Sequence, residues 1–207
     1  MMINDEWYRN HSWNKDIEKF FFDKLKRARD KEQYLRIQAS YLSGIEPHVS
    51  LKLLDMYFNL KDDFEHAQAY HTKATALINL GDFEGAVSSF KSALQREFEF
   101  PNLKTDAYID YPLFIIRSKL YKYYKDAYEV LNINEDRLMF PVDKFRWYAV
   151  KAIIDDHFGN NEISKDFATI ALVTAKIDKS GFEHHKHLGL VDNKYEDIIK
   201  QLISIAA

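Results

Sequence analysis

The chain of 207 residues contains no cysteine. This absence excludes a disulfide framework, a thiolate nucleophile and the sulfur ligands of the usual structural zinc sites. A reducing compartment is the default for such a composition, so we expect a cytoplasmic protein. The N-terminal residues MMINDEWYRNHSW lack the apolar core of a signal peptide, and apolar runs elsewhere are far shorter than a membrane span. We therefore expect no membrane partner.

An excess of one charge is also lacking, because 29 Lys and Arg residues face 32 Asp and Glu residues, for a formal net charge of −3. The chain therefore has no global field that would attract nucleic acid. The densest basic run, KLKRARDK at residues 24–31, is interrupted by Asp30 and flanked by Asp23 and Glu32. An ordinary charged helix face explains this run, and we expect no nucleic-acid partner.

Catalytic motifs are missing as well. The sequence has no phosphate-binding glycine loop, no GxSxG elbow, no HExxH and no calcium loop. We predict that the protein is not an enzyme and needs no cofactor. A metal-dependent hydrolase remains the lesser alternative, because Glu183, His184, His185 and His187 could ligate zinc or nickel. Adjacent histidines in a loop seldom converge on one ion, so we predict no metal site there.

Glycine and proline are scarce, with six and four residues, and most of them separate segments whose apolar residues recur at three- and four-residue spacing. This spacing is helical. Pro112 either begins a helix near Tyr111 or lies inside a longer one. The other predicted helices are Glu32–Ser43, His48–Leu60, Asp63–Leu80, Phe83–Glu97, Val142–Phe158 and Glu162–Lys176.

The turns between these helices recur regularly. Gly44, Gly81, Lys122 and Gly159 are separated by 37, 41 and 37 residues, a period typical of helical solenoids. In a solenoid each helix pair buries its apolar face against the neighbouring pairs. We therefore predict one all-α domain over residues 1–207. It comprises a capping helix within 1–30, about four helix pairs over 31–176, and a loop with a second capping helix over 177–207.

Both capping helices are predicted to be amphipathic, because the end of a solenoid exposes an apolar face that must be covered. The inward-facing residues are expected to be Ile17, Phe20, Phe21 and Leu25 at the N-terminal end, and Tyr195, Ile198, Ile199 and Leu202 at the C-terminal end. A homodimer formed through the terminal helices is the alternative use of these faces.

Residues 67–98 carry a specific pattern of aromatic, small and turn residues, namely Tyr70, Ala74, Gly81, Asp82, Ala86, Phe90 and Ala93. This segment resembles the tetratricopeptide repeat family. Residues 145–176 resemble the family more loosely, through Tyr148, Ala152, Ala168 and Ala171. The resemblance implies a right-handed α-α superhelix with a concave groove.

In that family the first helix of each pair forms the inner surface, along which ligands lie. Transferred by position, the groove would be lined by Gln68, His71, Thr75, Asn79, Arg146, Ala149, Ile153 and Asp156. The resemblance thus implies a non-enzymatic module that binds a protein or peptide partner. A regulator that responds to a signal peptide or small ligand is the alternative. His71 and Thr75 replace the lysine and asparagine with which chaperone-binding members hold a C-terminal carboxylate, so we do not expect that activity.

Overall fold

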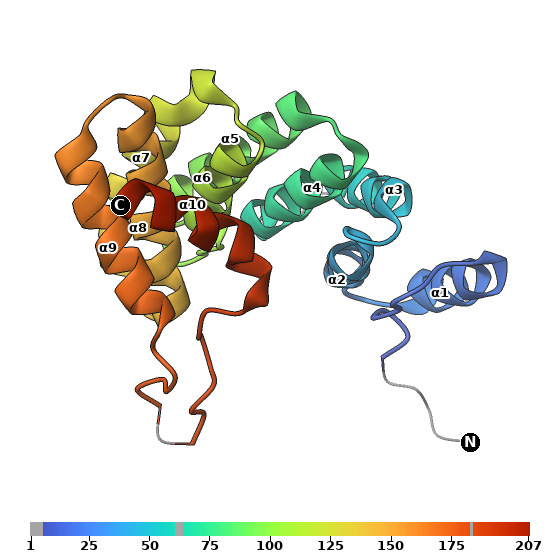
Figure 1. Cartoon of the computed structure of the whole chain (residues 1–207). Helices are drawn as coiled ribbons and strands as arrows, with labels where there is room; N and C mark the ends of the chain where they lie inside the picture. Colours follow the sequence, from blue (N-terminus) through green and yellow to red (C-terminus); the bar gives the residue numbers. More distant parts are fainter. Residues whose placement is uncertain (1–5, 61–63, 183) are drawn as a thin grey trace. The chain divides into compact units, whose positions relative to one another are not determined.

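The computed structural model describes residues 6–60, 64–182 and 184–207, and over these residues it contains helices and no strand (Figure 1). The all-α prediction is confirmed. The ten α-helices of the described residues are α1 (Lys15–Arg27), α2 (Lys31–Leu42), α3 (Pro47–Phe58), α4 (His66–Leu80), α5 (Phe83–Glu99), α6 (Ala107–Arg117), α7 (Tyr124–Ile133), α8 (Pro141–His157), α9 (Asn161–Ala175) and α10 (Glu196–Ala206). Short 3-10 turns η1 (Tyr121–Tyr123), η2 (Glu135–Arg137) and η3 (Asn193–Tyr195) precede α7, α8 and α10.

The predicted helix boundaries agree closely with these bounds. α5 begins at the predicted residue, Phe83, because the Asp82 side chain caps it by accepting a hydrogen bond of 2.9 Å from the Gly85 amide. α4 is described from His66, and its predicted start, Asp63, lies outside the described residues. Pro112 lies inside α6. Of the two predictions for this residue, the one that placed it inside a longer helix is therefore confirmed.

Two of the predicted turns close their helices in the same way. Gly81 after α4 and Gly159 after α8 have φ values of 77° and 80°, the left-handed conformation that glycine adopts without a steric cost. Lys119 takes this role after α6, with a φ of 51°. The repeat turn predicted at Lys122 is therefore at Lys119, and Lys122 lies in η1. Gly44, which is also a described residue, does not have a positive φ.

The chain forms two compact units, residues 1–107 and 108–207. In unit 1, α2 pairs with α3 and α4 with α5, and α4 also packs against α3 and α2. Ala74, Ala86, Phe90 and Ala93 are buried between α4 and α5, with at most 1% of their surface exposed. Successive helix pairs packed side by side are the arrangement expected of a solenoid. Its handedness, and a single domain over 1–207, stay predictions.

The N-terminal end of unit 1 packs through aromatic rings. Phe21 is fully buried, and the Trp7 ring lies 5.3 Å from it and 4.8 Å from Tyr34. The prediction that Phe20 also faces inward is wrong, since 49% of its surface is exposed. Adjacent residues on a helix point about 100° apart, so α1 cannot bury both rings in one core. The exposed Phe20 ring lies 5.4 Å from the ammonium of Lys24.

A buried glutamine fixes the segment that precedes α1. The Gln38 side chain, on α2, is fully buried, and its Oε1 accepts hydrogen bonds from the Asn10 backbone amide (3.0 Å) and side-chain amide (2.7 Å). Its Nε2 donates to the Asn10 carbonyl at 2.9 Å. The buried amide thus both donates to and accepts from Asn10, which orders this segment against α2.

In unit 2, α8 lies against α7, α9 and α10. Figure 1 shows α8 and α9 side by side, and Ala152 and Ala171 are fully buried at the positions the sequence assigned to their interface. α10 packs on both helices. Ile198 and Leu202 of α10, and Tyr195 at the end of η3, are each at most 2% exposed. The predicted inward face of the C-terminal helix is confirmed for these three residues. Ile199 is half-buried.

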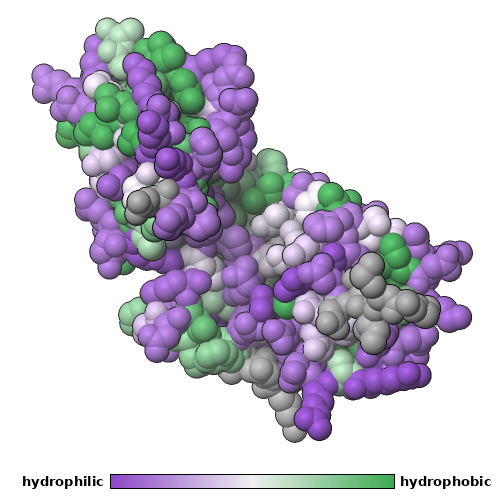
Figure 2. Space-filling view, turned by 90° about the horizontal axis from the view of Figure 1, so that it is seen from below, coloured by the Kyte–Doolittle hydropathy of each residue, from purple (hydrophilic) through white to green (hydrophobic). Residues whose placement is uncertain are grey.

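One face of the molecule is mostly polar (Figure 2). Figure 2 shows hydrophilic residues over most of one face of the molecule, with hydrophobic residues in smaller groups. No helix in the described parts of the chain combines the length and the apolar character needed to cross a bilayer.

Candidate functional site: a polar cavity in unit 1

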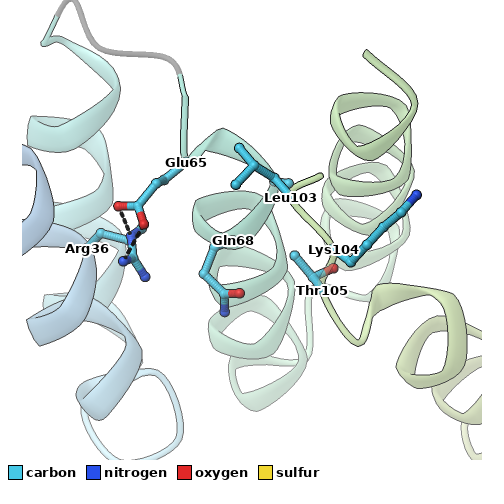
Figure 3. A pocket seen from close by; sticks show the side chains of 7 residues that line it. Arg36, Glu65, Gln68, Leu103, Lys104 and Thr105 are labelled. Carbon is cyan, nitrogen blue, oxygen red and sulfur yellow. Dashed lines mark hydrogen bonds and ion pairs between the residues drawn. The ribbon is translucent and has the colours of Figure 1, made fainter. Parts of the chain in front are cut away.

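A cavity of about 200 Å³ opens between α2, the first turn of α4 and the loop that follows α5 (Figure 3). It lies beside the first helices of two successive pairs, the part of the structure that the sequence predicted to form a groove. Its lining residues are Arg36 from α2, Glu65, Ala67 and Gln68 around the start of α4, and Leu103, Lys104 and Thr105 from the loop.

Arg36 and Glu65 form one wall of the cavity through a two-point ion pair. Nε and Nη2 of Arg36 donate to the two carboxylate oxygens of Glu65 at 2.8 and 2.9 Å. The side chains are 14% and 38% exposed, so water screens the pair only in part. Glu65 precedes the first residue of α4, where a carboxylate also interacts favourably with the helix dipole. The pair fixes the start of α4 against α2.

The opposite wall is a loop held in place by a buried carboxylate. Glu97, near the end of α5, is 3% exposed, and its Oε1 accepts hydrogen bonds from the backbone amide (2.9 Å) and the hydroxyl of Thr105. The Thr105 hydroxyl in turn accepts from the Ala107 amide at 3.1 Å. Because a buried carboxylate is costly without such partners, this arrangement strongly favours one path of the loop. We call Glu97 and Thr105 the loop anchor.

The polar chemistry of the cavity comes from Gln68, with Lys104 at its rim. The charges of Arg36 and Glu65 compensate each other, whereas Lys104 is exposed and has no hydrogen-bond or ion-pair partner among the described residues. Figure 3 shows Gln68 between the ion pair and the loop. The cavity therefore offers an amide that can donate and accept, and one cationic donor at the rim. These groups suit a carboxylate, an amide or a peptide carbonyl.

The four residues predicted on α4 have different surroundings. Gln68 lines the cavity. The His71 ring packs edge-on against Phe90 of α5, with 5.7 Å between ring centroids. Thr75 donates its hydroxyl to the His71 carbonyl, and Asn79 donates its side-chain amide to the Thr75 carbonyl, so both bond to their own helix. Of these four residues, Gln68 is the one that belongs to the described lining of the cavity.

The residues predicted on α8 offer a partner little accessible surface. The Arg146 guanidinium, 11% exposed, pairs with Asp110 at 2.9 Å and Asp143 at 2.7 Å. Burial alone would lower the pKa of Arg146, but the two carboxylates outweigh it and the pKa lies above its ordinary value. Ile153 is 4% exposed and Ala149 fully buried, so both are part of the core of unit 2. Asp156 is exposed.

Lys151 is a buried amine that sequence reasoning did not single out. Its Nζ donates to Asn132 Oδ1 at 2.9 Å and lies 4.0 Å from the ring centroid of Trp147 and 4.6 Å from that of Tyr128. Burial lowers its pKa, while the charges of Glu135 and Asp155 act in the opposite direction. With its charge stabilised by ring faces and an amide oxygen, this ammonium packs α8 against α7.

The loop that contains His184, His185 and His187 does not form a set of metal ligands among the described residues. No group of three or more His, Asp or Glu side chains that could hold an ion occurs among the described residues. His184, His185 and His187 are exposed, and Glu183 lies outside the described residues. The His185 carbonyl accepts from the Ser180 hydroxyl at 2.7 Å, which gives its backbone a structural role.

Most of the cavity lining was not identified from the sequence. Arg36 and Glu65 have opposite charges and stand on the first helices of two predicted neighbouring pairs, which is a signal that a search for charge pairs between helices could use. Leu103, Lys104 and Thr105 carry no such signal, because their place depends on the loop anchor.

No protein-family model, curated protein or solved structure matches this chain.

Proposed function

We propose that the protein is a non-enzymatic interaction module, similar to tetratricopeptide-repeat proteins, that binds a protein or peptide partner along α2 and α4. One side chain of the partner enters the cavity beside Gln68, and Lys104 at the rim contacts an acidic or carbonyl group. The observation that carries the proposal is this polar cavity at the junction of two successive helix pairs.

The size of the cavity favours a peptide over a cofactor. Small-molecule sites typically enclose about 300–1,000 Å³ and are mostly apolar, whereas this cavity encloses about 200 Å³ and is lined by charged and amide side chains. That volume suits a single side chain of a longer ligand. The rest of the affinity then comes from contacts along the exposed surfaces of α2 and α4, outside the cavity.

A photo-crosslinking experiment tests the proposal. Lys104 is replaced by a photoreactive phenylalanine derivative in the full chain, which is expressed in its native host, irradiated and analysed by mass spectrometry. The matched control carries the same derivative at Lys165, an exposed position on α9 of unit 2. We expect one protein to be cross-linked through position 104 and not through position 165.

The affinity of that protein is then measured with the Gln68→Glu variant, which keeps the shape of the side chain and adds a negative charge next to Glu65. We expect the affinity to fall about tenfold, the effect of one lost charge-assisted contact, with an unchanged melting temperature. Equal cross-linking at both positions, or equal affinity of the Gln68→Glu variant, would contradict the proposal.

A further inference from the structure

A second feature of unit 1 lies apart from the cavity, where α1 ends and α2 begins. Five cations occur within residues 24–31, and two of them, Lys26 and Lys31, stand at the edge of an open hollow of about 330 Å³. We call it the basic hollow; its lining residues are Phe22, Leu25, Lys26, Lys31 and Met56.

The floor of the basic hollow is apolar. It is formed by Phe22 and Leu25 from α1 and Met56 from α3, and 37% of the Met56 surface is exposed there. Methionine is flexible and polarisable, so such a floor adapts to side chains of different shape. The hollow is open to solvent, and its apolar floor offers contact area to one large apolar side chain.

Residues 24–31 include Lys26 and Lys31 at the hollow, and their cations are only weakly neutralised within the described residues. Lys26 pairs with Asp23 at 3.2 Å, but both side chains are more than half exposed, so that pair is weak. Arg27, Arg29 and Lys31 have no hydrogen-bond, ion-pair or ring partner in the described part of the chain. Part of this charge compensates the negative end of the α1 dipole, which explains Lys24, Lys26 and Arg27.

The start of α2 makes the local excess of positive charge larger. Lys31 is the first residue of α2, where a cation is unfavourable because the helix dipole is positive there. The preceding Asp30 does not cap the helix through its side chain. The first amides of α2 therefore have no side-chain cap from Asp30, and Glu32 in the first turn offsets the helix dipole only in part. An anionic group from a partner would accept from these amides and pair with Lys31.

We propose that the basic hollow binds an acidic peptide segment of a partner protein, with one large apolar side chain on Met56 and carboxylates against Lys26 and Lys31. Charge complementarity identifies this occupant, because the rim is cationic and the floor is apolar. A segment with acidic residues on both sides of a leucine, methionine or phenylalanine satisfies the two requirements together.

The distribution of acidic residues favours a peptide over a nucleic acid. Asp23, Asp30 and Glu32 alternate with the cations, so a continuous phosphate backbone would meet repulsion at each of them. Single-stranded nucleic acid also binds by stacking its bases on exposed rings, and the exposed Phe20 ring already has the Lys24 ammonium near it. A peptide can instead place its carboxylates only where cations stand.

The basic hollow and the cavity at Gln68 are separate surfaces. Lys31 of the hollow and Arg36 of the cavity are five residues apart on α2, which turns their side chains about 140° from each other. The two sites therefore share no lining residue. Failure of one proposal leaves the other standing.

The experiment is a selection of phage-displayed random dodecapeptides on the immobilised full chain, followed by counter-selection on the Lys31→Glu variant. We expect the enriched peptides to be acidic and to share one apolar residue at a fixed position. By fluorescence anisotropy, the affinity of a selected peptide falls about tenfold in Lys31→Glu and falls steeply with added salt. In Met56→Glu, which places a negative charge on the floor, binding is lost.

Two controls accompany these measurements. Lys165→Glu makes the same charge change in unit 2 and leaves the affinity within about twofold of that of the unmodified chain. Melting temperatures identify any variant whose fold is disturbed. Enrichment of neutral or basic peptides, or of none, would overturn the proposal. Tighter binding of an oligothymidylate or of phosphatidylserine vesicles, with the same loss in Lys31→Glu, would also overturn it and assign the surface to nucleic acid or membrane.

Discussion

The pairs α4–α5 in unit 1 and α8–α9 in unit 2 carry similar sequence patterns but have different surroundings. Each pair closes on a left-handed glycine and meets through alanines. α4 buries small or uncharged side chains and has a polar cavity at its start. α8 buries Asp143, Lys151 and Asp155 because it is covered by α7, α9 and α10. α4 and α8 each pack against three other described helices, so whether the hairpin lines a site or forms the centre of a core depends on which side chains surround it.

Several ionisable groups of unit 2 have a shifted pKa. They include Tyr111, Tyr124, Tyr128 and Lys151. Burial is the largest cause for each of these four. Unit 2 thus buries several ionisable groups, whereas in unit 1 the Arg36–Glu65 pair lies at the margin and Glu97 is a buried carboxylate.

The largest expected effect is a difference between two ion pairs, Arg146–Asp143 in unit 2 and Arg36–Glu65 in unit 1. Arg146→Met leaves Asp143, 7% exposed, without its cation, and we expect unit 2 to lose about 3 kcal/mol of stability. Arg36→Met leaves the half-exposed Glu65, which water can solvate, and we expect a loss of about 1 kcal/mol in unit 1. Urea unfolding followed by hydrogen exchange of each unit measures both. Equal losses would mean that burial does not distinguish the pairs.

The next effect concerns alkaline pH. Burial raises the pKa of Tyr124 to about 12, and burial with the hydrogen bond to Asp155 raises that of Tyr128 further. Since the unfolded tyrosines lose their protons near pH 10, their stabilising contribution is complete below that value and is lost as pH rises through the folded pKa. We expect unit 2 to unfold before unit 1 above pH 10.

Lys151 acts in the opposite direction, because its lowered pKa means that stability from this group rises with pH up to its ordinary value of 10.5. Hydrogen exchange of each unit at alkaline pH separates the contribution of Tyr128 from that of Lys151, with Tyr128→Phe as the test variant. The variant should shift the alkaline unfolding of unit 2 to higher pH. Earlier unfolding of unit 1 would show that the tyrosines do not control the transition.

The smallest effect concerns the turns. Lys119 occupies the left-handed region that costs a residue with a side chain roughly 1–2 kcal/mol. We expect Lys119→Gly to stabilise unit 2 by about 0.5 kcal/mol, because greater freedom of the unfolded chain offsets part of the gain. Gly159→Ala should destabilise it by about 1 kcal/mol. A Cβ at Gly159 would meet no atom within 4 Å, so its effect comes from the backbone alone. Calorimetric melting of both variants measures these two changes in stability.

The sequence was sufficient for the helices and for part of the site. Breakers such as Gly81 and the spacing of apolar residues gave the helix bounds, because both act over a few residues. The turn at Lys119 was misplaced because a lysine there replaces the expected glycine. Phe20 was misassigned because a run of phenylalanines does not reveal which ring faces the core.

The remaining lining of the cavity depends on contacts between distant residues. Gln68 followed from its position on the first helix of a pair. Lys104 could not be found in this way, because the path of its loop is set by Glu97, eight residues before Thr105. Ile153 was assigned to the groove by analogy, and α10, far along the chain, is among the helices that cover α8.

The loop anchor has an evolutionary consequence. Glu97 and Thr105 carry the structural requirement of the loop, whereas Leu103 and Lys104 line the cavity or its rim without an anchoring hydrogen bond of their side chains. Among descendants of this chain, the anchoring residues would change together or be retained, while the two beside them would be free to diverge. One scaffold could thereby exchange its ligands by drift at two positions.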